Sequence, residues 1–178
     1  MPVPRGYLTR AKPLEREALE ALSAPERYPL LTRLGRLDRV VFQLGQFPSF
    51  SVYTTWALVQ KPDGYFVRRV VWDRSTNPQT TTSPLLYGSE GQLPTEPAEA
   101  LASEFHNLSV PLSPFQEPLG LGLDGTRYSL ATDRFKIALT LSWWESGPPG
   151  WEPLAQCHTR AVELFEAHLP PTTREQKG

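Results

Sequence analysis

Residues 49–72 read SFSVYTTWALVQKPDGYFVRRVVW, and this stretch carries the clearest structural signal in the chain. Its two parts, 49–60 and 65–72, are rich in β-branched and aromatic residues, which favour strands. Between them, Lys61-Pro62-Asp63-Gly64 has the composition of a tight turn. The stretch therefore predicts two antiparallel strands, and the apolar run at 39–44 adds a third to give a three-stranded meander.

A second group of strand signals lies in the last third of the chain. Apolar runs occupy residues 119–123, 126–131 and 135–144, and Asp124-Gly125 is a hairpin signal between the first two. We therefore expect a second three-stranded meander in this region.

Amphipathic helices are predicted near the N-terminus, in the centre and near the C-terminus, at residues 13–22, 95–108 and 152–169. Local runs of strands with helices around them favour an α+β fold, whose antiparallel sheet comes from the two meanders. We expect one domain over residues 1–170 and a flexible polar tail at 171–178.

Residues 74–94 combine threonine, serine, proline and glycine, and they are predicted to form a long loop. A loop of this length in a compact domain is usually either functional or mobile. Asp73 stands directly before this loop and Tyr87 lies within it. An acid at a strand end beside a loop is a common position for an active-site residue, and it is also an ordinary way for a strand to end.

The composition argues against several classes of protein. With 39% hydrophobic residues, 21% charged residues and a net charge of -1, the chain has no excess of charge that would draw it to nucleic acid or to anionic membrane. No apolar run approaches the roughly 20 residues of a membrane span, and no signal-peptide pattern is visible. The single cysteine, Cys157, excludes an intramolecular disulfide and suits a reducing compartment. These features predict a cytoplasmic location.

Nucleophilic and metal-ligating side chains do not form a recognisable pattern. Cys157 and His158 are adjacent in a predicted helix, where neighbouring positions point about 100° apart, and this argues against a nucleophile and base pair. His158 and His168 lie about 15 Å apart along the same helix and cannot share a metal ion. The sequence therefore predicts neither a metal site nor a cofactor.

Arginine and tryptophan residues supply the candidate binding side chains. Arg68 and Arg69 lie among aromatic residues, as in a stacking platform for nucleic acid, but adjacent strand residues point to opposite faces. The same alternation applies to Trp143 and Trp144, of which one should be buried and the other exposed. Trp151 follows a proline-rich turn, where it either packs onto this pair or serves as an anchor for a partner.

Three short motifs stand in the last third of the chain: Leu123-Asp124-Gly125-Thr126-Arg127-Tyr128-Ser129-Leu130, Trp143-Trp144 and Pro149-Gly150-Trp151-Glu152-Pro153-Leu154. Together they resemble the C-terminal part of uncharacterised small bacterial proteins. The resemblance covers only the last third of the chain. It implies a bacterial origin and a hairpin followed by a helix, and it brings no assigned activity.

Three function classes remain open at this point. The leading hypothesis is a non-enzymatic module that binds another protein through the 74–94 loop together with Trp144 and Trp151. The first alternative is an enzyme with a cleft under that loop, served by Asp73, Tyr87 and either Arg68 or Arg69. The second alternative, nucleic-acid binding, is disfavoured by the near-neutral charge. The oligomeric state is left open.

Overall fold

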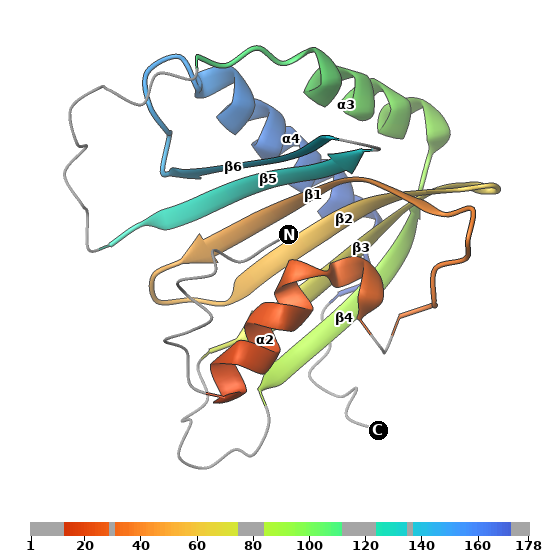
Figure 1. The fold of residues 1–178 in the computed structure, drawn as a ribbon, viewed down its shortest axis with the longest axis horizontal. Coiled ribbons are helices and arrows are strands. Elements are labelled where there is room, and N and C mark those ends of the chain that lie inside the picture. The colour runs from red at the N-terminus through yellow and green to blue at the C-terminus, as the bar shows by residue number, and fades with distance from the viewer. Residues whose placement is uncertain (1–12, 29–30, 75–83, 112–123, 135–136, 172–178) are drawn as a thin grey trace.

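The structure, a computed structural model, describes residues 13–28, 31–74, 84–111, 124–134 and 137–171 (Figure 1). Its elements follow in this order: α2 (Pro13–Ser23), η1 (Pro25–Arg27), β1 (Arg39–Pro48), β2 (Tyr53–Lys61), β3 (Gly64–Asp73), β4 (Leu85–Leu93), α3 (Thr95–Asn107), β5 (Thr126–Arg134), β6 (Ile137–Trp144) and α4 (Glu152–His168).

The six strands form one antiparallel sheet in the order β4-β3-β2-β1-β5-β6. This arrangement confirms the predicted α+β class and the predicted helices near the N-terminus, in the centre and near the C-terminus. Strand β1 joins the two groups of strands, because it pairs with β2 on one side and with β5 on the other. The Lys61-to-Gly64 turn connects β2 to β3 as the sequence predicts.

The prediction of a loop over 74–94 is wrong for Leu85–Leu93. These residues form β4, which pairs with β3 from Tyr65↔Leu93 to Asp73↔Leu85. Glycines gave the segment the composition of a loop, but two of them are required by close packing. A Cβ atom on Gly88 would collide with the ring of Tyr28, and one on Gly91 would collide with the carbonyl oxygen of His168. The glycines therefore mark a strand that is approached closely from both faces.

Two other expectations change in detail. The strand predicted to start at residue 49 begins only at Tyr53, and Phe50 lies in the preceding turn with 85% of its surface exposed. The strand predicted at 119–123 and most of the 171–178 tail lie outside the described residues.

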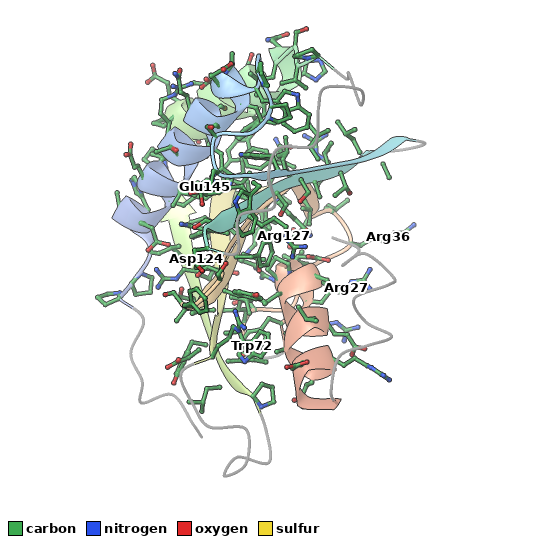
Figure 2. All side chains as sticks on the ribbon, turned by 90° about the vertical axis from the view of Figure 1, so that its left-hand side faces the viewer. Arg27, Arg36, Trp72, Asp124, Arg127 and Glu145 are labelled. Atoms are coloured by element: carbon green, nitrogen blue, oxygen red, sulfur yellow. The ribbon has the colours of Figure 1, made fainter. Side chains whose placement is uncertain are left out.

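Helices cover both faces of the sheet, but not to the same extent. Figure 2 shows α3 and α4 on one side of the sheet and α2 on the other. The α3 and α4 side holds the larger core, where Phe42 packs against Phe105 and Phe165 with ring centroids 4.5 and 6.1 Å apart. The α2 side holds a smaller core around Leu22, Tyr28, Phe47 and Val70.

Strand β6 is the least covered strand on the α2 side. Helix α2 and η1 pack mainly on β2 and β3, at the other end of the sheet. Four β6 residues that point to the α2 side are exposed: Ala138, Thr140, Ser142 and Trp144. The uncovered strand and the elements opposite it therefore border an open space.

Candidate functional site

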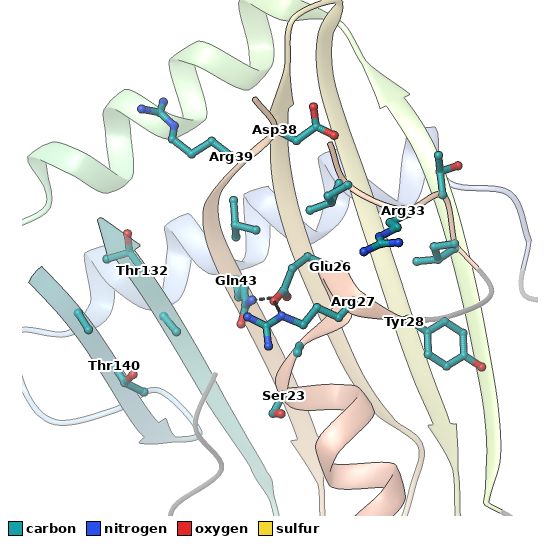
Figure 3. A pocket seen from close by; sticks show the side chains of 17 residues that line it. Ser23, Glu26, Arg27, Tyr28, Arg33, Asp38, Arg39, Gln43, Thr132 and Thr140 are labelled. Carbon is teal, nitrogen blue, oxygen red and sulfur yellow. Dashed lines mark hydrogen bonds and ion pairs between the residues drawn. The ribbon is translucent and has the colours of Figure 1, made fainter. Parts of the chain in front are cut away.

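A groove of about 1060 Å³ opens on the α2 side of the sheet (Figure 3). One wall comes from η1 and residues 31–39, and the other wall comes from β5 and β6. The floor is strand β1 at Gln43. The two walls lie about a hundred residues apart in the sequence, and only the pairing of β1 with β5 brings them together.

The floor of the groove is held in place by a buried pair of polar side chains. Gln43 is only 8% exposed, and its Nε2 donates a hydrogen bond of 2.7 Å to the Glu26 carboxylate. On the opposite wall, Thr132 donates through Oγ1 to the carbonyl oxygen of Val41 at 3.3 Å. Ala131, Ala138 and Thr140 complete this wall with small side chains. The groove is therefore fixed in shape at its base and wide at its β6 wall.

Positive charge gathers on the wall that faces β6. Arg27 and Arg33 line the groove there, beside the carboxylates of Glu26 and Asp38, whereas the Arg39 side chain turns away to donate to Gln60. The Arg27 side chain is 84% exposed, although it lies 3.5 Å from Glu26, and Figure 3 shows it beside the Gln43–Glu26 pair. Glu26 is already bonded to Gln43, and Asp38 accepts a hydrogen bond from the Gly35 amide. The wall carries both signs of charge, but Arg27 and Arg33 are exposed whereas Glu26 and Asp38 are half-buried, so the guanidinium groups are the more accessible to a ligand.

Three of the sequence-predicted residues meet on the other face of the sheet. Arg69, Asp73 and Tyr87 line a cavity of about 460 Å³ beside α4. Arg69 is 5% exposed, and it is engaged by the protein itself. Its Nε donates to Ser89 Oγ at 3.1 Å, its Nη2 donates to the carbonyl oxygen of Pro170 at 2.7 Å, and its Nη1 pairs with Glu166. This arginine therefore anchors the end of α4.

Arg68 lies on the opposite face from Arg69, as the alternation of strand residues predicts. Its side chain is fully buried, and its Nη1 donates to the carbonyl oxygen of Glu26 at 2.7 Å. The other nitrogens bond to the Thr32 carbonyl oxygen and to the Glu90 carboxylate. Arg68 therefore ties η1 and the groove wall to the sheet, and it does not face a ligand.

The tryptophans divide as expected between core and surface. Trp143 is 4% exposed, whereas Trp144 is 38% exposed on the other face. Trp151 packs edge-on against Trp143 at 6.1 Å, and its indole N–H donates to the Pro111 carbonyl oxygen at 2.9 Å. Because β6 and β4 are opposite edges of the sheet, Trp144 and the 85–93 segment do not form one contiguous surface.

The groove residues Glu26, Arg27 and Gln43 were not singled out from the sequence. One signal could have found Gln43, because it is an amide within the otherwise apolar run of β1. Such a residue at a buried position needs a hydrogen-bond partner. The sequence offered no comparable signal for the arginines, which look like ordinary surface residues.

Titratable groups in the core are held in their neutral forms. Burial lowers the pKa of His158 to about 4, and it raises the pKa of the Cys157 thiol to about 12. The two side chains do not form a nucleophile pair, since His158 Nε2 lies 3.3 Å from the carbonyl oxygen of Gly45. In the described part of the chain, no three His, Cys, Asp or Glu side chains gather as a metal site would require.

Comparison with protein-family models, with curated proteins and with solved structures finds no match for this chain. Among the described helices, none has both the length and the apolar character needed to cross a membrane.

Proposed function

We propose that this chain binds another protein by accepting an extended, acidic segment of that protein in the groove. The observation that carries the proposal is the pairing of an arginine-bearing wall with an uncovered wall of small side chains. Exposed arginines attract carboxylates, and alanine and threonine leave room for a polypeptide backbone. The proposal keeps the protein-binding function predicted from the sequence and places it on a different surface.

The groove has room for a short peptide. Pockets for small molecules span about 300–1,000 Å³ and enclose most of the ligand. The groove measures about 1060 Å³, at the upper end of this range, and it reaches the outermost strand β6 at Ala138 and Thr140. An extended segment lying there would contact the side chains of both walls.

The position of the charges sets the expected composition of the bound segment. Arg27 and Arg33 stand on the wall opposite Thr140, so acidic side chains on one side of the segment would meet them. Small or polar side chains on its other side would lie against Ala138 and Thr140. This arrangement supports a segment in which acidic and small residues alternate.

Selection of displayed random peptides on the intact chain tests the proposal. We expect acidic, extended peptides to be enriched, and Arg33→Glu to weaken their binding by about tenfold or more. Arg16→Glu is the matched control, because Arg16 is an exposed arginine of α2 outside the groove. Peptides without an acidic bias, or an equal loss in the two variants, would refute the groove as the binding site.

The enzyme alternative rests on the cavity that contains Asp73 and Tyr87. Arg69 is bonded on all three nitrogens within the protein, so the test concerns Asp73 and Tyr87, the other two predicted residues that line the cavity. A small-molecule screen by thermal shift, repeated on Asp73→Asn and Tyr87→Phe, would reveal a ligand of this cavity. Arg68 and Arg69 are both buried, so no observation favours nucleic-acid binding. The bacterial origin and the cytoplasmic location stay predictions.

A further inference from the structure

Among the described residues, strand β6 is an edge of the sheet without the usual protection of edge strands. Native proteins block such edges with charged residues, prolines, glycine bulges or covering segments, since an open edge pairs with other strands. The sequence of β6, IALTLSWW, contains no charged residue, no proline and no glycine. Leu139 is 44% exposed on one face and Trp144 is 38% exposed on the other.

The backbone of β6 offers a regular set of hydrogen-bonding groups at this edge. The Glu145 amide donates to the Thr126 carbonyl oxygen at 2.9 Å, directly across the β5–β6 register. Amides on one strand alternate in direction, so the odd-numbered residues of β6 point toward β5. Ala138, Thr140 and Ser142 therefore point their N–H and C=O groups away from β5, where no strand of the described residues lies.

The composition of β6 suits a second copy of the same strand. None of its residues is charged, so antiparallel pairing of two copies places no like charges against each other across the two-fold axis. The outward N–H and C=O groups of Ala138, Thr140 and Ser142 would be matched by the same groups of the second copy.

We propose that two copies of this chain associate by antiparallel pairing of their β6 strands, forming one continuous sheet through both. This pairing uses the backbone edge of β6, whereas the groove uses its side chains, so the two proposals stand or fall separately. Leu139 and Trp144 of each copy lose exposed surface in the pair, and this burial adds to the hydrogen bonds of the new ladder.

Sedimentation equilibrium of the intact chain over a range of concentrations tests this inference. We expect a mass that approaches twice the 20.0 kDa of one chain. Ser142→Pro removes an outward N–H without removing a hydrogen bond to β5, and proline is tolerated at this position of an edge strand. Both copies carry the substitution, so two hydrogen bonds of the shared ladder are lost at once. We therefore expect the dissociation constant of the dimer to rise by roughly ten- to a hundredfold.

Two further variants at Ser142 separate the loss of the backbone N–H from the change of side chain. Ser142→Val is the matched control, since it retains the N–H and favours a strand, and it should remain dimeric. Ser142→Lys keeps every backbone group and places a charge in each copy of the paired strand, so it should weaken the dimer in a way that added salt partly reverses.

Three outcomes would overturn the inference. A monomer at all concentrations excludes self-pairing at this edge. A dimer that Ser142→Pro and Ser142→Lys leave intact must use another surface. A monomer whose thermal stability falls in Ser142→Pro but not in Ser142→Val would mean that the chain's own residues pair with β6.

Discussion

The two edge strands of the sheet, β4 and β6, differ in how closely the rest of the molecule packs against them. Strand β4 is held from both faces, with Tyr28 against Gly88 and the end of α4 against Gly91. Its Glu90 is paired with the buried Arg68 and with Lys61. Among the described residues, strand β6 is paired only with β5, and it exposes most of its side chains. The contrast teaches that packing from both faces fixes the β4 end of the sheet, whereas the β6 end is held from one side.

The largest expected effect is at the β4 end. Arg68→Leu should lower the free energy of unfolding by about 3–5 kcal/mol, because it leaves two carbonyl oxygens without their donor and Glu90 with Lys61 as its remaining cation. Urea denaturation measures this change. Arg27→Leu is the control, because it removes an exposed guanidinium group. It should change the free energy of unfolding by no more than about 0.5 kcal/mol. Similar losses in the two variants would break the contrast between the covered and the open parts of the molecule.

A pH effect of nearly this size is expected from the middle of the sheet. His158 lies against Gly45 of β1, and burial lowers its pKa from 6.5 to about 4. Between about pH 6.5 and pH 4, His158 is therefore protonated in the unfolded chain but mostly neutral in the folded chain. Stability should be complete above about pH 6.5 and should fall by about 3 kcal/mol as the pH drops to 4. Denaturation curves at several pH values measure this loss.

The control for this pH effect is His158→Gln, which cannot titrate. Its stability should depend less on pH between 6.5 and 4 than that of the original chain. An equal slope in both proteins would assign the acid sensitivity to other groups.

A smaller effect is expected from a single substitution to alanine at each edge. Gly91→Ala forces the Cβ atom against the carbonyl oxygen of His168, so the end of α4 must shift, at a cost of about 1–3 kcal/mol. On β6, Ser142→Ala removes only an exposed hydroxyl and should change stability by about 0.5 kcal/mol or less. Thermal unfolding compares the two. If Gly91→Ala is neutral, close packing is not what holds β4.

The two edges also differ in how well the sequence predicts them. Strand β6 follows from its apolar run, and the separation of Trp143 from Trp144 follows from simple alternation. Strand β4 was predicted as a loop, because Gly88 and Gly91 interrupt its hydrophobic pattern. Both glycines are required by close contacts with Tyr28 and His168. Because these two residues are remote in the sequence, a local pattern cannot predict the contacts.

The groove could not be predicted for a related reason. Its arginines and its threonines come from segments that are far apart in the chain, and only the β1–β5 pairing makes them neighbours. Local patterns predicted β1, β2 and β3 well, since a four-residue turn links two of these strands directly. Strand order across the sheet depends on contacts between distant residues, and periodicity does not encode them.

Because Cys157 is buried, the rate at which its thiol reacts can report how often the native structure opens. It is the single cysteine of the chain, it has no exposed surface, and its thiol remains protonated because its pKa is about 12. Alkylating reagents react with thiolates, so they can modify the native chain only when α4 lifts from the sheet or the whole domain opens. The labelling rate therefore reports the frequency of opening. A cysteine introduced at Thr140, an exposed residue of the groove, should react much faster than Cys157. A dye can therefore be attached in the groove while Cys157 remains unlabelled.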